Sequence, residues 1–341
     1  MSRVTADELT DLVRRAFQRQ GVNADMAQDA ASMLVTTEMM GIRTHGLAKV
    51  GPYVERLRDG GVDPEADPIV TAPAPALRQV DGRNGLGPAV ALRGVRAAVE
   101  AARAAGMGAS FCRGSSHLGA LAPQLLEAAE AGCAALFVTN SAPMIAPPGG
   151  HRPVIGNTPL GIAVPDPATA RHVILDMALS MVARSKVRQA AARGEAIPDT
   201  WATDAEGRPT TDAAAAMQGL MQAIGGAKGA HLSLCLDLLA GGLSGAAMLS
   251  EVPNANLDTG AVANVGHMFV VIDVARLMPS DAVSRRVEDA RAMLRAGAAE
   301  AADPSPRLPG ARAMAELADA RANGVAVEAT VLESLHELAD G

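Results

Sequence analysis

The sequence predicts an α/β fold with helical segments at both ends of the chain. Short runs rich in apolar and β-branched residues alternate with helical patterns in the middle of the chain, which is typical of an α/β domain. At both ends, apolar residues recur at helical intervals. The chain has 341 residues, of which 49% are hydrophobic and 20% charged, so it is long enough for two or three compact units.

The N-terminal region predicts three helices. Thr5 and Glu8 have capping-box spacing at the start of the first helix, and Asn23 begins the second. A third helix is expected to carry Tyr53. The proline-rich stretch that follows, residues 60–80, predicts an extended connection.

The middle of the chain predicts two helices, over 88–105 and 121–131, each followed by a strand. The strand segments are GASFCRG, AALFVTN, GIAVP, HVILDMA and HMFVVIDV, in that order. The stretch 231–249 approaches the length of a membrane span, but Asp237 and a glycine pair interrupt it. It therefore predicts a buried helix and turn.

Composition argues against several classes of protein. The net charge is −7 and no basic run is present, so nucleic acid is not an expected partner. The N-terminus lacks an apolar signal core, and the three widely spaced cysteines suit a reducing cytoplasm, where we expect the protein to reside without membrane attachment. The seven histidines are scattered, so no metal site is expected.

Three familiar ligand or catalytic motifs are incomplete. The segment GRNGLGP has its glycines in the wrong order for the GxGxxG fingerprint of a standard Rossmann fold. The segment GGAKGA lacks the Ser or Thr that follows lysine in a P-loop, and GSSHLG lacks the last glycine of a hydrolase elbow. A different kind of site is therefore expected.

Polar residues follow several predicted strands in glycine-rich turns, where ligands of α/β proteins commonly bind. The same residue types dominate helix caps and turns, so both interpretations stay open. A helix start next to His117 would also offer free amides to an anion. These residues are His117, Thr139, Asn140, Asn157, Thr158, Asp176, Lys228 and Gly229.

The segment GIRTHGLAKVGPYVERL, residues 41–57, places a histidine, a lysine and the only tyrosine of the chain within nine positions. His45 is flanked by Thr44 and Gly46 at the end of a helical pattern. A histidine in this place either transfers a proton or is held by the helix dipole, and the residues alone leave both readings open.

These segments, in this order, resemble the malate/L-lactate dehydrogenase family, which lies outside the Rossmann dehydrogenases. Its members include 2-hydroxyacid, ureidoglycolate and sulfolactate dehydrogenases, diketogulonate reductase and cyclic-imine reductases. The resemblance extends over essentially the whole chain. It rests on GIRTHGLAKVGPYVERL, RGSSHLGA, VTNSAPMIAPPGG, GNTPLGIAVP, LDMALSMVARSKV, IPDTWATDAEGRPTTD, IGGAKGAHLSL and RLPGAR.

The resemblance implies roles for particular residues. His45 corresponds to the family's proton donor, with the hydroxyl of Thr44 beside it. Lys49 stands where many members have an arginine that grips the substrate carboxylate, and Tyr53 is expected to face the substrate. NAD or NADP is the expected cofactor. Its expected contacts are His117, Thr139, Asn140, Asn157, Thr158, Leu175, Asp176, Met177, Ala178, Leu179, Ser180, Met181, Lys228, Gly229, Gly310, Ala311 and Arg312.

The resemblance also implies a fold: an unusual mixed-sheet cofactor domain with a helical domain formed by the two ends of the chain. We expect residues 1–58 with 280–341 to form the helical domain, 59–125 with 255–279 a connecting α/β region, and 126–254 the cofactor-binding domain. A homodimer is expected.

The expected reaction is hydride transfer between NAD(P) and C2 of a small 2-hydroxy or 2-oxo carboxylate, such as malate, lactate or sulfolactate. One alternative is a reductase of cyclic imine 2-carboxylates, and a second is a catalytically silent binding protein on the same scaffold. Lys186 occupies the position at which the imine reductases carry an aspartate, which favours the hydroxyacid reading.

Overall fold

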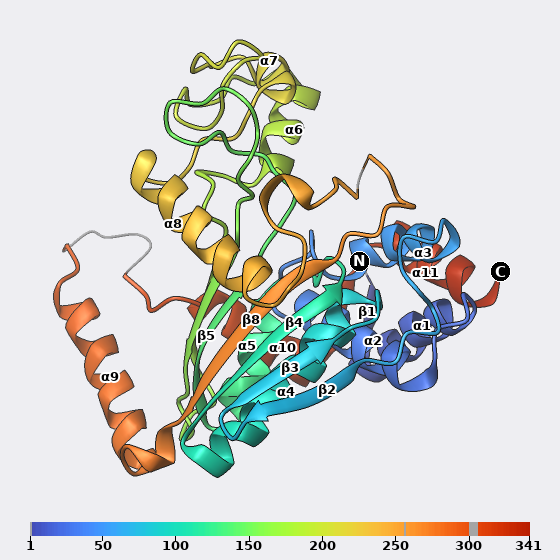
Figure 1. Cartoon of the computed structure of the whole chain (residues 1–341). Helices are drawn as coiled ribbons and strands as arrows, with labels where there is room; N and C mark the ends of the chain where they lie inside the picture. Colours follow the sequence, from blue (N-terminus) through green and yellow to red (C-terminus); the bar gives the residue numbers. More distant parts are fainter. Residues whose placement is uncertain (1, 256, 300–305) are drawn as a thin grey trace.

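The computed structural model describes residues 2–255, 257–299 and 306–341, and a seven-stranded sheet lies at its centre (Figure 1). Only β3 and β4 run parallel, and every other neighbouring pair is antiparallel, so the sheet is mixed as expected. The strands, in sheet order, are β2 (Ile69–Ala74), β3 (Leu77–Asp81), β4 (Met107–Ser115), β8 (Val265–Asp273), β5 (Cys133–Thr139), β6 (Leu160–Val164) and β7 (Val173–Met177).

Two helices, α4 (Gly87–Ala105) and α5 (Ala122–Glu130), pack against the sheet, and α2 (Ala24–Met39) packs on both. The alanine-rich faces of these helices allow a close approach. A Cβ on Gly94 of α4 would lie 2.5 Å from the Cys112 sulfur, so the small residue is required there. A core with few aromatic residues is thus built from close backbone contacts.

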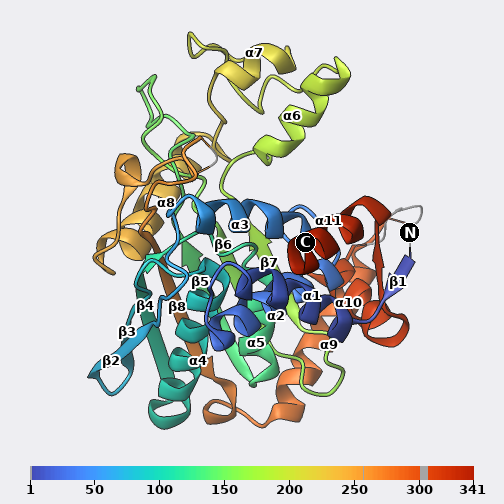
Figure 2. The ribbon, with the colours of Figure 1, turned by 90° about the vertical axis from the view of Figure 1, so that its right-hand side faces the viewer.

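The N- and C-terminal helices lie side by side (Figures 1 and 2). The helices α1 (Ala6–Gln18) and α3 (Val50–Arg58) pack with α11 (Ala329–Asp340), and α10 (Ala311–Asn323) packs on α2. A two-stranded sheet of β1 (Ser2–Val4) and β9 (Val325–Val327) joins the two ends. The predicted capping box of Thr5 and Glu8 is confirmed.

A lobe above the sheet carries α6 (Arg184–Arg193) and α7 (Ala213–Gln218) (Figure 1). It has its own small core, which includes Val187 and Ala190 of α6 and Met221. Below it, α8 (Ala227–Asp237) leads into a π-helical turn, η2 (Leu238–Gly242). The helix α9 (Ser280–Ala296) lies at the side of the molecule, where Arg291 pairs with Asp166 at 2.8 Å.

Two expectations about local structure are wrong. The proline-rich stretch 60–80 contains a hairpin, β2–β3, because Pro73 lies in the edge strand β2, where a missing N–H is tolerated. The stretch 231–249 is half exposed rather than buried, with Leu243 at 64% exposure. Within the described residues, no helix has the length and hydropathy needed to cross a membrane.

Candidate active site

His45 lies in a tight turn between α2 and the short 3-10 helix η1 (Leu47–Lys49). Its amide donates to the Ile42 carbonyl at 3.0 Å, which closes the turn. Its Nδ1 is 2.9 Å from the Thr44 hydroxyl. Because Nδ1 is engaged in this way, Nε2 is the ring nitrogen left to face a substrate.

Glu38 fixes this turn, and its only signal in the sequence is a carboxylate within an apolar helix. Its Oε2 accepts a hydrogen bond from the Leu47 amide at 3.0 Å, at the start of η1. A Cβ at Gly46 would lie 2.4 Å from the same oxygen, so only glycine allows this approach. Burial raises the pKa of the Glu38 carboxyl.

His117 joins the same cluster from the loop between β4 and α5. Its ring stacks on that of His45, with centroids 5.8 Å apart, and its Nδ1 is 2.8 Å from the Tyr53 hydroxyl. The Gly119 amide donates to the same Nδ1 at 3.2 Å, so Nε2 carries the proton of the neutral ring. The structure therefore brings together Thr44, His45, Lys49, Tyr53 and His117.

The cluster is poor in negative charge. Burial, and next the positive charge of Lys49, lower the pKa of His45 to about 4. Burial and then the charge of Arg188 lower the pKa of Lys49 in turn. His45 is therefore neutral at pH 7 in the ligand-free protein, and an anion bound beside Lys49 would raise its pKa.

Lys186 does not reach His45. Its ammonium lies over the indole of Trp201, 5.4 Å from the ring centroid, inside the lobe. The orienting partner of His45 in this chain is the hydroxyl of Thr44. This arrangement differs from one in which a carboxylate holds the ring.

A second group of predicted residues surrounds the segment 175–181. The Leu179 amide donates to the Asn157 carbonyl at 2.7 Å, and the Ile224 amide donates to the Leu179 carbonyl at 2.9 Å. Ile224 leads directly into α8, which carries Lys228 and Gly229 in its first turn. The structure thus brings Asn157, the segment 175–181 and the start of α8 together.

The start of α8 suits a phosphate of a dinucleotide. Its N-cap is Gly226, which offers no side chain to the first amides of the helix. A Cβ on Gly229 would lie 1.9 Å from the Ile224 carbonyl oxygen, so the glycine is needed for the tight turn. Next to Asn157 in the chain, the buried hydroxyl of Thr158 has no hydrogen-bond partner within the described residues. These residues fit a nicotinamide dinucleotide.

The expectation of free amides beside His117 is wrong. The carboxylate of Asp176 already accepts the Ala122 amide at 2.9 Å and caps α5. Burial raises the pKa of Asp176. The loop 116–121 thus turns His117 toward His45 while its far end is anchored on β7, and this links the two groups of residues.

Thr139 and Asn140, at the end of β5, are engaged with the protein itself. The Thr139 hydroxyl is 2.8 Å from Nδ1 of His267, whose Nε2 is 2.8 Å from the Ser115 hydroxyl. The Asn140 amide group donates to the Ala247 carbonyl at 2.7 Å, and its oxygen accepts the Gly266 amide at 2.9 Å. Their side chains hold the ends of three neighbouring strands together.

Gly310 lies against β7, which carries the start of the segment 175–181. It adopts φ +80°, and a Cβ there would lie 2.5 Å from the Ile174 carbonyl oxygen. Arg312 follows in α10 and is exposed. Gly310, a predicted cofactor contact, therefore lies next to β7 although it is far from that strand in the chain.

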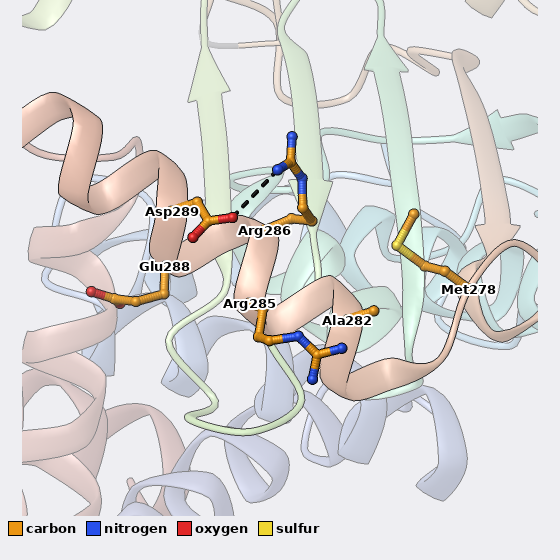
Figure 3. A pocket seen from close by; sticks show the side chains of 6 residues that line it. All are labelled: Met278, Ala282, Arg285, Arg286, Glu288 and Asp289. Atoms are coloured by element: carbon orange, nitrogen blue, oxygen red, sulfur yellow. Dashed lines mark hydrogen bonds and ion pairs between the residues drawn. The ribbon is translucent and has the colours of Figure 1, made fainter.

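A surface hollow elsewhere in the molecule lies along α9 (Figure 3). Its lining includes Arg286 and Asp289, which form an ion pair at 3.3 Å, and none of the predicted site residues. Within the described residues, no group of three or more His, Cys, Asp or Glu side chains is arranged to hold a metal ion.

Comparison with known proteins supports the resemblance. The chain is 37% identical to the (2R)-3-sulfolactate dehydrogenase (NADP⁺) of Chromohalobacter salexigens, covering 84% of this chain and 86% of that one. It is 32% identical to the malate dehydrogenase of Pyrococcus horikoshii, covering 84% and 80%. The solved Δ1-piperideine-2-carboxylate reductase of Pseudomonas syringae superposes with a TM-score of 0.89 at 30% identity, covering 99% and 100%. A sequence model of the malate/L-lactate dehydrogenase family matches residues 4–336, and the chain belongs to that family.

Proposed function

We propose that this oxidoreductase transfers hydride between NAD or NADP and C2 of a small 2-hydroxy or 2-oxo carboxylate, with His45 transferring the proton. The observation that carries the proposal is the cluster of His45, Lys49, Tyr53 and His117, in which a half-buried imidazole lies beside a cation. Relatives that act on malate and sulfolactate support the substrate class.

The protonation state of His45 determines whether its ring can accept or donate the proton. In the oxidation direction its neutral Nε2 accepts the proton of the substrate hydroxyl. In the reduction direction the ring must first take up a proton. A substrate carboxylate beside Lys49 offsets the positive charge there and raises the pKa of His45, so substrate binding and proton uptake are coupled.

Two further side chains orient the substrate in this proposal, and a third holds the ring of His45. The Lys49 ammonium holds the carboxylate attached to C2. His117 donates from Nε2 toward the oxygen on C2, because its Nδ1 is occupied by Tyr53 and Gly119. Thr44 holds the His45 ring through Nδ1. Two imidazoles and one ammonium then surround the reacting carbon.

The cofactor is assigned to the group around the segment 175–181. Residues at the start of α8, including Lys228 and Gly229, hold a phosphate, while Asn157, Thr158 and Asp176 flank the dinucleotide. Gly310 and Arg312 complete the site at β7. When bound, the nicotinamide supplies or accepts the hydride. Within this proposal, 126–254 is the cofactor-binding domain, 59–125 with 255–279 connects it, and 1–58 with 280–341 forms the helical domain.

Reduction of a cyclic imine 2-carboxylate is the second candidate, since the piperideine-2-carboxylate reductase has a closely similar fold. Against it, His45 is held by a hydroxyl and Lys186 lies over Trp201. Initial rates with NADH and NADPH on oxaloacetate, sulfopyruvate, pyruvate and piperideine-2-carboxylate separate the two. Higher kcat/KM on the imine than on every 2-oxo acid would reverse the choice. Binding of cofactor without turnover of any of them would favour a silent binding protein.

A homodimer is part of the proposal. One face of the sheet carries an apolar row of direct cross-strand neighbours, and its large members Leu77, Leu136 and Ile162 are 41%, 39% and 38% exposed. Such a surface is typical of a subunit interface. Light scattering after gel filtration should give a mass twice that of one chain for the wild type. For Leu136→Lys it should give the mass of one chain. A monomeric wild type would contradict this part.

We also place the protein in the cytoplasm. Cys112, Cys133 and Cys235 are free thiols, which suits a reducing compartment. Fractionation of the native host, followed by detection with an antibody, tests this assignment. Recovery of the protein outside the cytoplasmic fraction would contradict it.

A further inference from the structure

His267 is a buried imidazole that the proposed reaction does not use. It lies on β8, between β4 and β5 in the sheet (Figure 1). Its side chain is fully buried, and burial lowers its pKa to about 3, so the ring is neutral. Its Nε2 is 2.8 Å from the Ser115 hydroxyl at the end of β4, and its Nδ1 is 2.8 Å from the Thr139 hydroxyl at the end of β5. A neutral ring has one N–H, so one hydroxyl accepts from the ring and the other donates to it.

A bulge in β4 brings the Ser115 hydroxyl to this ring. Cys112 pairs with His267, whereas Ser115 pairs with Val265, so β4 has one residue more than β8 over this stretch. Such a bulge changes the direction of the side chains that follow it, and bulges are common beside active sites. In this chain the bulge lies directly before the loop that carries His117.

The backbone between Ser115 and His117 is held closely on both sides. The hydroxyl of Ser116 accepts the Gly87 amide at 2.8 Å, at the start of α4. A Cβ on Gly87 would lie 2.2 Å from the His117 carbonyl oxygen, so the loop rests directly on this helix. With so little slack in the loop, the place of the His117 ring depends on where β4 ends.

The other hydroxyl partner of His267 lies next to the proposed cofactor site. The amide of Thr139 donates to the Pro159 carbonyl at 3.3 Å. Two residues further on, the Ser141 hydroxyl accepts the Asn157 amide at 3.1 Å. The end of β5 is therefore bonded to the segment 157–159, and a path of hydrogen bonds leads from that segment through Thr139 and His267 to the strand that carries the His117 loop.

We infer that His267 is a positioning residue, which holds the loop that carries His117 at a fixed place relative to the proposed cofactor site. This inference rests on the proposed function, in which His117 donates to the oxygen on C2. A displacement of about 1 Å in a group that orients the substrate can cost about 10²-fold in rate. In this role His267 acts through Ser115 and exchanges no proton with the substrate.

The test removes the bond between the ring and the loop with Ser115→Ala, and measures steady-state rates on oxaloacetate and pyruvate with NADH and NADPH. Ser115→Ala should lower kcat about 10-fold while the KM for the cofactor changes less than about twofold. His267→Gln should show the same kind of loss, because its amide can engage one hydroxyl but not both. The matched control is Ser110→Ala, a fully buried serine of the same strand whose hydroxyl donates to the Gly94 carbonyl at 2.7 Å. It should keep kcat within about twofold.

A double-mutant comparison tests whether Ser115 acts through His117. In a His117→Ala background, Ser115→Ala should change kcat less than about twofold, because the group that it positions has already been removed. Equal losses in the two backgrounds would overturn the inference. A normal kcat in Ser115→Ala, or a loss of the same size in Ser110→Ala, would overturn it as well.

Hydrogen exchange adds a readout that needs no turnover. Peptides that cover 115–121 should exchange faster in Ser115→Ala than in the wild type and in Ser110→Ala. Unchanged exchange over 115–121 would reject the role of His267 even if no 2-oxo acid were reduced. Faster exchange in a protein whose wild type reduces neither a 2-oxo acid nor an imine would instead reject the proposed function and leave the link between His267 and the loop standing.

Discussion

The role of His45 can be predicted from the sequence, but the contacts that hold its turn and its ring are visible only in the structure. The sequence places it beside Thr44 and Gly46, and the family resemblance predicts its role in proton transfer. Only the structure shows that Glu38 holds its turn and that burial and Lys49 keep its ring neutral. The hydrogen bond of Glu38 joins residues nine positions apart, and burial depends on the whole fold, so no local pattern records either of them.

Replacing His45 by alanine should lower kcat about 10²- to 10⁴-fold, because proton transfer by a positioned side chain contributes about that much. The affinity for NADH should remain within about twofold, since the proposed cofactor contacts lie on other elements. Stopped-flow turnover and fluorescence titration of NADH measure the two effects. Survival of activity within a factor of a few would remove His45 from proton transfer.

Replacing Lys49 by methionine should raise the pKa of His45, because the positive charge is the second cause, after burial, of its lowering to about 4. An NMR titration of the ligand-free protein measures that shift. The same change should lower kcat/KM for 2-oxo acids about 10- to 100-fold, because the carboxylate loses its cation. Lys49→Arg, which keeps the charge, should leave the pKa of His45 low. Equal pKa values in all three proteins would contradict the arrangement.

Most helices and strands could be predicted from the sequence, but the strands with which each strand pairs could not. The helices over 88–105 and 121–131 appear as α4 and α5, because their periodicity is long and continuous. The five strand segments were located, but their order in the sheet was not, since pairing joins β4 and β5 through β8, from more than a hundred residues later. The hairpin β2–β3 was hidden by proline, which is usually absent from strands.

The hydrogen bond between Glu38 and the Leu47 amide holds the turn that carries His45, and its removal tests whether that turn supports catalysis. Glu38→Ala should leave the Leu47 amide without its acceptor and destabilise the fold by about 1–3 kcal/mol. It should also lower kcat more than it changes the KM of the cofactor. The matched control is Glu55→Ala on the exposed side of α3. Denaturant unfolding and steady-state kinetics give both quantities. A normal kcat at lowered stability would make Glu38 structural only.

The start of α8 tests the cofactor assignment. Gly229→Ala places a methyl group against the Ile224 carbonyl oxygen, so the first turn must shift. We expect weaker binding of NADH and NADPH with a smaller change in the unfolding midpoint. Gly51→Ala in α3, where a methyl group meets nothing within 4 Å, is the control and should bind both normally. Normal affinity in Gly229→Ala would exclude this turn from the site.

The whole molecule should lose stability in mild acid. Burial lowers the pKa of His45 to about 4 and of His267 to about 3, and it also lowers that of His172. Because the unfolded chain takes up these protons near pH 6.5 and the folded chain does not, stability is complete above that pH and falls as the pH drops toward the folded values.

Carboxyl groups with raised pKa values, Glu38, Asp176 and Asp237, act in the opposite direction in acid, so one histidine must be isolated. Unfolding free energies at pH 7, 6, 5 and 4.5 should decline less steeply in His267→Gln than in the wild type. The exposed His336→Gln is the control and should keep the wild-type slope. Identical slopes in all three proteins would show that His267 is not buried in its neutral form.

Hydride transfer to C2 can be followed with NADH or NADPH that carries deuterium at both C4 positions. The protein is mixed with this cofactor and a 2-oxo dicarboxylate, and the product is examined by NMR and mass spectrometry. The wild type should form a 2-hydroxy acid with one deuterium on C2, and His45→Ala should form it about 10²-fold more slowly or slower still. A product without deuterium at C2, or equal rates in the two proteins, would contradict the proposed reaction.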